Sequence, residues 1–497
     1  MKNWTAQSSY VIMRKLNSKL LKQIHNWIRG IFVSKREDCK RSIVFFLAGL
    51  LILAVTLAFA YVWYDYYLDR LAWMPFWRRG NWVMIAVYAV IFTMVARLYG
   101  GLKVGYLKKI DEFYSLTLTV ICANIAEYVQ ITLVNRYFLD PLPLVKMTGV
   151  QIILVVLWIF ASGHIYSRIY RARRLLVIHG NRDPGDLIDK MNSRKDKYNV
   201  SGKVHVKAGE DMIHEMMEDY DGVIIWDLPS AERNRYLKYC FAHSIRCYMS
   251  PKISDVIIMG SDRIHLFDTP LLMSRNMGLS LEQRAAKRAV DILVSAAGIF
   301  LTSPIMLVIA ILVKGYDGGP VFYFQDRLTL DGKTFKICKF RSMCVDSEKK
   351  GARLASRHDS RITPVGKVLR RLHLDELPQL FNVFKGDMSL VGPRPERSEI
   401  MKEYEKELPE FYYRLKVKGG LTGYAQVYGK YNTTPYDKLK LDLFYIENYS
   451  FLLDIKLLFM TVKIFFQKET SEGVSDNQVN ALKDSVRASE KEEEKCR

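Results

Sequence analysis

Two adjacent carboxylates, Asp375 and Glu376, have the surroundings in this 497-residue sequence that best suit chemistry on phosphate. A basic helical pattern that includes Arg370 ends just before them, and a stiff Gly-Pro-Arg-Pro segment after them carries Arg394. Guanidinium groups bind phosphate oxygens in a bidentate manner, and a carboxylate can attack phosphorus. An isolated acid pair is more often a solvated helix cap than a catalytic site. The flanking arginines and the rigid turn favour a phosphate-processing site here.

The elements that must position these carboxylates are two short helices. Apolar residues recur at helical spacing from Val365 to Leu372, and Pro378 stands where a first helical position tolerates a missing N–H. The acid pair therefore falls at a helix start, where free N–H groups and the helix dipole favour an ionised carboxylate or an incoming phosphate. The Gly- and Pro-rich segment that follows cannot continue a helix and is predicted to cradle phosphate.

This stretch and four others resemble the bacterial polyprenyl-phosphate sugar-1-phosphate transferases, which are the monotopic phosphoglycosyl transferases. The resemblance covers roughly residues 286–473. Its motifs are LDELPQLFNVFKGDMSLVGPRPE, GGPVFYFQDR, FKICKFRSM, GLTGYAQVYGK and YDKLKLDLFYIENYSFLLDIKLL. The apolar and soluble segments upstream look like the long form of this family, which initiates capsule or exopolysaccharide synthesis.

The resemblance implies an activity and a set of site residues. A hexose-1-phosphate would pass from a UDP-sugar to polyprenyl (undecaprenyl) phosphate, with release of UMP. Asp375 would be the nucleophile that carries the sugar phosphate, and Glu376 would bind Mg²⁺, which needs only one or two protein carboxylates beside substrate phosphates. The residues that would bind substrate or phosphate are Arg370, Arg394, Lys339, Arg341 and Lys430.

The resemblance assigns three of these binding roles less firmly than the others. Lys339 and Arg341 could equally form structural ion pairs. Lys430 stands where many relatives have arginine, and lysine cannot make a planar bidentate contact.

Composition indicates a membrane protein with anionic partners. The hydrophobic share is 49%, and most of the excess lies before residue 165. The net charge of +21 is spread over the membrane flanks and the C-terminal domain, which fits lipid head groups and phosphorylated substrates better than nucleic acid. The seven cysteines form no CxxC pair, so the sequence indicates neither a disulfide framework nor a zinc site.

Four apolar runs, at about 42–64, 81–98, 113–134 and 143–165, are each near the roughly 20 residues that cross a bilayer. Basic residues before the first run and after the fourth place both flanks in the cytoplasm. Glu127 lies in the third run, where a carboxylate is either functional or turned towards a neighbouring helix, and its role is left open.

Residues 287–314 form a further apolar segment, long enough to be a fifth span. Pro304 removes a helical hydrogen bond, which costs about 3 kcal/mol or more in a regular helix, and Ser303 can satisfy part of the freed backbone. We expect a helix broken at this dipeptide that enters and leaves the same leaflet, as in the family's re-entrant hairpin. An ordinary Pro-kinked span would put the carboxylates outside the cell, where nucleotide sugars are absent.

The expected fold class is an α-helical membrane domain plus α/β. Between the membrane runs and the catalytic region, LLVIHG, VHVKAG, DGVIIWD and IRCYMSP predict parallel strands of a Rossmann-like sheet. The first turn, GNRDPG, lacks the full dinucleotide pattern, which favours a regulatory or structural module. The predicted parts are a basic cytoplasmic segment 1–41, four transmembrane helices in 42–168, a Rossmann-like domain 169–285, an α/β catalytic domain 286–472 and a disordered tail 473–497.

These features predict a protein of the bacterial cytoplasmic (inner) membrane with its catalytic domain on the cytoplasmic face. Its partners would be a UDP-sugar, undecaprenyl phosphate and the bilayer, without nucleic acid, and a homodimer is compatible with this arrangement. The alternative is a catalytically inactive membrane sensor or scaffold with a nucleotide-binding domain. A four-span transporter is a third hypothesis, but the spans carry few of the polar groups that would line a transport path. No residue identifies the sugar, so glucose and galactose follow from the resemblance alone.

Overall fold

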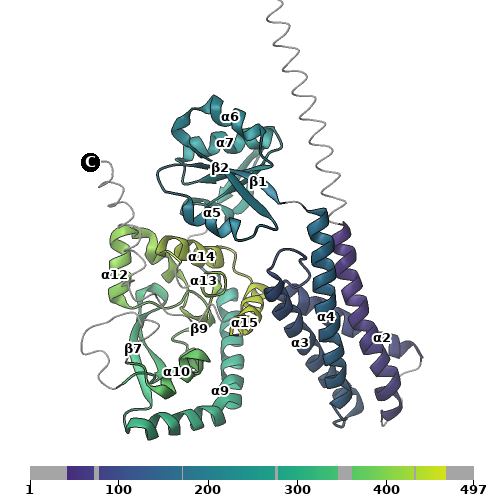
Figure 1. The fold of residues 1–497 in the computed structure, drawn as a ribbon. Helices are drawn as coiled ribbons and strands as arrows, with labels where there is room; N and C mark the ends of the chain where they lie inside the picture. The colour runs from purple at the N-terminus through teal and green to yellow at the C-terminus, as the bar shows by residue number, and fades with distance from the viewer. Residues whose placement is uncertain are drawn as a thin grey trace, which may run out of the picture. The chain divides into compact units, whose positions relative to one another are not determined.

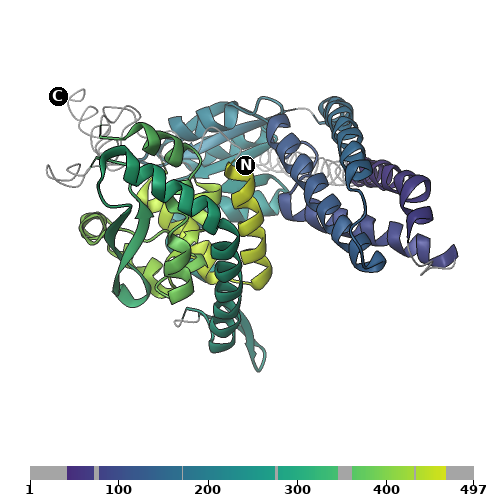
Figure 2. The ribbon, with the colours of Figure 1, turned by 90° about the horizontal axis from the view of Figure 1, so that it is seen from below.

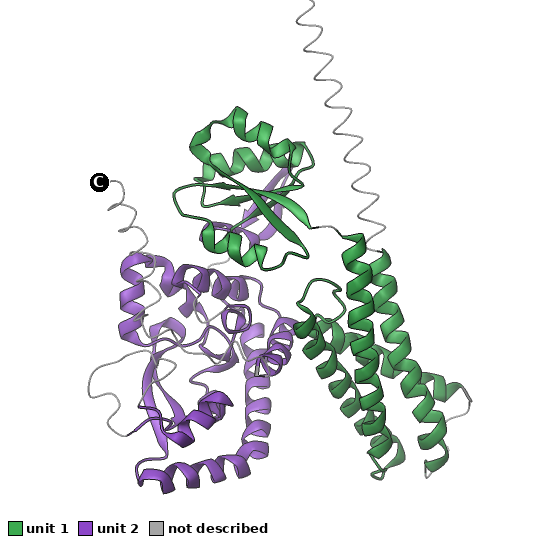
Figure 3. Cartoon of the chain, in the orientation of Figure 1, with its two compact units in different colours: residues 1–250 green, residues 251–497 purple. Residues whose placement is uncertain are grey.

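The computed structural model describes residues 42–71, 78–170, 172–274, 278–344, 361–429 and 433–465. The predicted basic segment 1–41 and tail 473–497 lie outside these residues. The chain divides into two compact units, a first unit Met1–Ser250 and a second unit Pro251–Arg497 (Figure 3).

The first unit opens with long apolar helices at the positions of the predicted runs (Figure 1). Their bounds are Ser42–Arg70, which ends in η1 (Trp63–Tyr67) and η2 (Leu68–Arg70), then α2 (Arg78–Tyr99), α3 (Lys109–Asn135) and α4 (Leu142–Ile169). Together with α9 (Leu281–Asp317) of the second unit, they are the five helices in the described ranges that are long and apolar enough to cross a membrane. Their length and composition fit a membrane protein.

Polar side chains occupy part of the interior between these helices. Tyr88 donates from its hydroxyl to Asn124 Oδ1 at 2.8 Å, and Gln151 Nε2 donates to the carbonyl of Val55 at 3.1 Å. Glu127 is fully buried, and neither of its carboxylate oxygens has a hydrogen-bond partner among the described residues.

A parallel sheet follows in the first unit, in the order β2-β1-β3-β4. Its elements are β1 (Arg173–His179), α5 (Gly185–Asn192), β2 (Tyr198–His205), η3 (Val206–Ala208), α6 (Glu210–Glu218), β3 (Gly222–Trp226), α7 (Ser230–Ala242) and β4 (Arg246–Met249). The strands predicted at LLVIHG, DGVIIWD and IRCYMSP are confirmed.

The prediction of a strand over VHVKAG is wrong in its position. The strand starts earlier, at Tyr198, and ends at His205, where the backbone N–H of Lys207 donates to the His205 ring at 3.1 Å and the chain turns. Gly202 interrupts the apolar pattern of the true strand, and a side chain there would collide with the hydroxyl of Tyr220. The strand was predicted too late in the sequence because Gly202 leaves no apolar alternation through its first part.

The second unit mixes short strands with helices around buried apolar clusters. Its elements before the acid pair are α8 (Ile253–Met259), β5 (Asp262–Leu266), β6 (Thr269–Met273), α9, β7 (Phe322–Leu328), η4 (Leu330–Gly332), β8 (Thr334–Phe340) and α10 (Pro364–Arg371). From the acid pair onward they are η5 (Leu374–Glu376), α11 (Gln379–Lys385), β9 (Ser389–Val391), α12 (Ser398–Glu407), η6 (Pro409–Lys416), β10 (Gly420–Thr422), α13 (Tyr424–Tyr428), α14 (Pro435–Glu447) and α15 (Phe451–Phe465). Strands β5–β6 and β7–β8 pair antiparallel, and β9–β10 pair parallel.

Helix α9 is longer than the predicted apolar segment and is bent into two limbs (Figure 1). It begins at a capping box, in which Gln283 N–H donates to Ser280 Oγ and Ser280 N–H donates to Gln283 Oε1. Pro304 lies inside it, and Ser303 Oγ donates to the carbonyl of Phe300 at 2.8 Å. That carbonyl is the one an N–H at position 304 would have bonded, so the serine replaces the bond that proline removes.

The first limb of α9 is tied to α15, which runs beside it in both views (Figures 1 and 2). Lys287 Nζ donates to Asp454 Oδ2 at 2.5 Å and to the hydroxyl of Tyr445 at 3.0 Å, and that hydroxyl donates to Asp454 Oδ1 at 2.9 Å. These contacts fix the helix against the core of the second unit.

Candidate active site

The acid pair lies in the short turn η5, between α10 and α11. The two flanking helices match the sequence prediction, but Pro378 is the residue before α11 and not its first residue. His373 adopts a left-handed conformation, with φ of 54°, and this turns the chain from α10 into η5. Thr363 starts α10 by accepting the N–H of Gly366 at 2.9 Å on its hydroxyl.

Apolar packing sets the position of η5. Leu374 and Leu377 pack against a buried cluster that joins the second limb of α9 to β8 and α10. The buried members of this cluster are Met306, Ile309, Val313, Phe340 and Leu369. The acid pair is therefore held beside the part of α9 that follows Pro304.

Glu376 is the charged centre of the site. Its Oε1 accepts hydrogen bonds from Lys339 Nζ at 2.7 Å and from Arg394 Nη2 at 2.8 Å. Burial alone would raise the pKa of Glu376, but Arg394 and Lys339 outweigh it and hold that pKa well below its usual range. Glu376 is thus ionised at neutral pH.

Asp375 has a different environment. It is 8% exposed and accepts no hydrogen bond from any described residue. Burial, followed by the charge of Glu376, raises the pKa of Asp375, while Lys339, Arg370 and His373 oppose the shift without cancelling it. The carboxylate is consequently more basic than a solvated aspartate, and no protein donor covers its oxygens in the described part of the chain.

Lys339 reaches Glu376 because β8 is bonded to α11 through Asn382. The Asn382 side chain donates from Nδ2 to the carbonyl of Lys336 at 2.8 Å, and it accepts the N–H of Cys338 on Oδ1 at 2.9 Å. Asn382 is 7% exposed. The sequence reasoning missed this residue, although a lone amide inside the apolar run of α11 is the signal that could have found it.

The structure treats the other three predicted binding residues differently. Arg370 is half-buried, and its side chain forms no hydrogen bond or ion pair with the residues described, so its guanidinium is available to a ligand. Arg341 forms a bidentate ion pair with Asp317 at the end of α9, and no contact joins it to the acid pair in the described structure. Lys430 lies outside the described residues.

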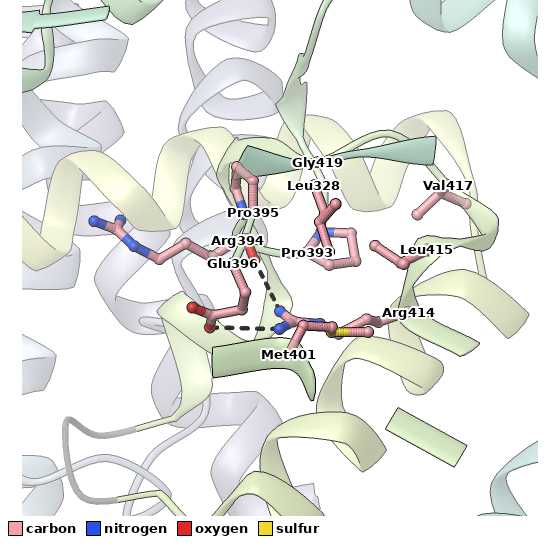
Figure 4. Close-up of a pocket in the computed structure, with 10 residues that line it drawn as sticks. All are labelled: Leu328, Pro393, Arg394, Pro395, Glu396, Met401, Arg414, Leu415, Val417 and Gly419. Carbon is pink, nitrogen blue, oxygen red and sulfur yellow. Dashed lines mark hydrogen bonds and ion pairs between the residues drawn. The ribbon is translucent and has the colours of Figure 1, made fainter. Parts of the chain in front are cut away.

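Arg394 extends from the Gly-Pro-Arg-Pro turn, and Figure 4 shows its side chain pointing away from Arg414. The side chain is 44% exposed, although its guanidinium contacts Glu376. Arg394 therefore combines a fixed partner with access for a ligand.

The family resemblance implies a metal ion at the acid pair, and the carboxylates present can be compared with what such an ion needs. The described residues contain no group of three or more His, Cys, Asp or Glu side chains that could hold a metal. One or two carboxylates are nevertheless sufficient for Mg²⁺ when substrate phosphates and water complete its shell. Glu376 is the carboxylate that would supply such a ligand to an ion that arrives with a diphosphate.

Residues 282–468 match the family model described as bacterial sugar transferase. The UDP-N-acetylgalactosamine-undecaprenyl-phosphate N-acetylgalactosaminephosphotransferase of Aeromonas hydrophila is 40% identical over 237 residues, which are 47% of this chain and 55% of that protein. The UDP-glucose:undecaprenyl-phosphate glucose-1-phosphate transferase of Escherichia coli (strain K12) is 41% identical over 204 residues, 40% of this chain and 42% of that protein. The chain thus spans about half the length of these curated relatives.

A shorter relative is covered almost completely. The uncharacterized sugar transferase EpsL of Bacillus subtilis (strain 168) is 41% identical over 199 residues, which are 39% of this chain and 93% of that protein.

Proposed function

This chain belongs to the bacterial sugar transferase family, and on that premise we propose that it transfers a hexose-1-phosphate from a UDP-sugar to undecaprenyl phosphate. The products are UMP and undecaprenyl-diphosphate-sugar, and the reaction is the first step of exopolysaccharide or capsule assembly. The observation that supports it most is the contrast within the acid pair. Asp375 is free of protein donors, while Glu376 is ionised and holds two cations.

In the first step, a carboxylate oxygen of Asp375 attacks the phosphorus that bears the sugar. An O–P bond forms, the bond from that phosphorus to the bridging oxygen breaks, and UMP leaves with the electron pair. The raised pKa of Asp375 makes the oxygen a better nucleophile than that of a solvated aspartate. Because Asp375 accepts no bond from the described residues, attack requires no protein hydrogen bond to be broken.

In the second step, a phosphate oxygen of undecaprenyl phosphate attacks the same phosphorus. The bond between Asp375 and phosphorus breaks, and the carboxylate is restored. Both steps bring anions together, so cations must lower the repulsion and align the groups in line. Lys339, Arg370 and Arg394 are the candidates, since the Arg370 side chain has no described partner and Arg394 is partly exposed.

Glu376, together with the phosphates of the substrate, would hold Mg²⁺, which would supply further charge neutralisation. The protein itself positions two cations for the substrate phosphates, because Lys339 and Arg394 both donate to Glu376 Oε1.

We also propose that α9 is re-entrant and keeps the catalytic unit on the cytoplasmic face of the bacterial inner membrane. The break at Ser303 and Pro304 and the two limbs of Figure 1 support this geometry. Both limbs expose large apolar side chains that suit lipid contact: Leu293, Phe300, Leu301, Leu307 and Leu312. The parallel sheet of the first unit is proposed to be a Rossmann-like module with a structural or regulatory role.

The test is transfer in membranes that contain the protein. Labelled UDP-glucose, UDP-galactose and UDP-N-acetylgalactosamine are each incubated with undecaprenyl phosphate, with and without Mg²⁺, and the labelled lipid and released UMP are measured. We expect one sugar to be transferred by the wild type and none by Asp375→Asn. An inactive sensor or scaffold would transfer no sugar, and retained labelling in Asp375→Asn would refute the assignment of the nucleophile.

A further inference from the structure

The turn that carries Arg394 is held at four consecutive carbonyl groups. Residues 393 and 395 are prolines without an N–H, so carbonyl oxygens are the main groups through which this turn can be fixed. The bonds are Gly420 N to Pro393 O (2.9 Å), Arg414 Nη2 to Arg394 O (2.9 Å), Arg327 Nη1 to Pro395 O (3.1 Å) and Leu328 N to Glu396 O (3.0 Å). Two of the four donors are therefore arginine side chains.

Arg414 is itself fixed by carboxylates. It is 2% exposed, and its guanidinium lies 2.8 Å from Asp442 Oδ2 and 3.4 Å from Glu396 Oε1. Glu396 also pairs with Lys438. Burial would raise the pKa of Glu396, but Lys438 and Arg414 outweigh it and hold that pKa below its usual range. Glu396 is therefore ionised beside both cations. A buried guanidinium with two directed hydrogen bonds, to Glu396 and to the Arg394 carbonyl, and an ion-pair contact with Asp442 has little freedom to move.

Arg414 and the side chain of Arg394 lie on different sides of the turn. Figure 4 shows Arg414 bonded to Glu396 and to the backbone of Arg394, while the Arg394 side chain extends the other way. Arg394 then reaches Glu376 at 2.8 Å. Arg414 thus touches the backbone of a residue that contacts the acid pair, and in the described structure no contact joins it to the pair itself.

We propose that Arg414 is a positioning residue for sugar-phosphate transfer, which fixes the Arg394 carbonyl so that the Arg394 guanidinium meets Glu376 and the substrate phosphate. This inference rests on the proposed function. Arg327 acts in the same way on the next carbonyl. A lysine at position 414 keeps the charge but cannot direct planar donors to a carbonyl and two carboxylates together.

A double-mutant cycle separates positioning from a merely structural role. We measure kcat and KM of full-length wild type, Arg394→Ala, Arg414→Lys and the double variant in lipid nanodiscs. Loss of a hydrogen bond to a charged group is worth roughly 1.5–3 kcal/mol, or about 10- to 150-fold, so Arg414→Lys should lower kcat/KM by at least about tenfold. In the Arg394→Ala background the same change should cost less than about threefold, because its effect passes through Arg394. Equal losses in both backgrounds overturn the proposal.

Arg288→Lys is the matched control. Arg288 also holds two carbonyls, those of Val383 and Phe384, each at 2.7 Å, but these belong to α11 and not to the turn. Arg288→Lys should therefore lower kcat/KM by the same factor in the wild-type and in the Arg394→Ala background. If Arg414→Lys does not fold, Arg327→Lys takes its place. Arg327→Lys should lower kcat/KM in the wild-type background and lower it much less in the Arg394→Ala background. Equal fold-losses in the two backgrounds overturn the proposal.

Hydrogen exchange tests the positioning without activity. The amides of residues 392, 394, 396 and 397 should exchange faster in Arg414→Lys than in the wild type and stay unchanged in Arg288→Lys. A wild type that transfers no sugar phosphate would refute the proposed function alone. Unchanged hydrogen exchange at these amides in a folded Arg414→Lys would refute the positioning role of Arg414.

Discussion

Replacing Lys287 with methionine should loosen α9 from the core of the second unit. The Lys287 ammonium lies 2.5 Å from Asp454 Oδ2, and the two side chains are 9% and 11% exposed. Methionine fills a similar volume but leaves the Asp454 carboxylate buried with Tyr445 as its remaining described partner. Removing one partner of a buried ion pair typically costs about 3–5 kcal/mol.

The expected loss can be converted to a melting temperature. For a domain of 150–250 residues, 1 kcal/mol corresponds to roughly 2–4 °C, so Lys287→Met should lower the Tm of the second unit by about 6–20 °C. The assay is thermal unfolding of the full-length protein in detergent, followed by intrinsic fluorescence. Adding Asp454→Leu should restore most of the loss, because an apolar replacement of a whole buried pair is often neutral.

Lys385→Met is the control for this series. Lys385 pairs with Asp387 at 3.6 Å, but its side chain is 76% exposed, and exposed pairs are worth about 0–1 kcal/mol. A Lys287→Met shift no larger than that of Lys385→Met would refute the reasoning. So would a double variant that is as unstable as the single one.

Three further predictions concern the site and its membrane anchor. Because burial and Glu376 raise the pKa of Asp375, kcat/KM should fall on acidification at a pH above the ordinary aspartate pKa of about 3.9. Arg370→Met removes a cation that opposes this shift and should move the fall to higher pH, whereas a shift to lower pH would contradict the assignment. Asn382→Ala should lower kcat/KM about tenfold or more through Lys339, with a stability loss of about 1–3 kcal/mol, and unchanged kinetics would count against the role of Asn382. Lys333→Cys in intact cells should resist a membrane-impermeant maleimide, whereas labelling from outside would rule out a re-entrant α9.

The helices around the acid pair could be predicted because local patterns determine them. Apolar spacing and the turn residues fixed α10 and α11 to within a few residues, and the Gly-Pro-Arg-Pro segment could only be a turn. Ser303 was expected to support the break at Pro304, and its bond to Phe300 O is present. Each of these features depends on residues at most a few positions apart.

Contacts between distant residues could not be predicted in the same way. Arg341 was a candidate for substrate binding, but it pairs with Asp317, 24 positions earlier, and no periodicity links the two. Lys339 meets Glu376 from a strand, β8, that Asn382 bonds to α11. The role of Arg414 depends on Asp442 from α14, so its position behind the turn becomes visible only once the chain is folded.

The covalent step through Asp375 is tested most directly by mass spectrometry of the protein quenched during turnover. The full-length wild type is mixed with the UDP-sugar it accepts, without undecaprenyl phosphate, and is then digested. A peptide containing Asp375 should gain the mass of one sugar phosphate, lose it when undecaprenyl phosphate is added, and never gain it in Asp375→Asn. Full turnover with no such adduct on Asp375 would contradict the account.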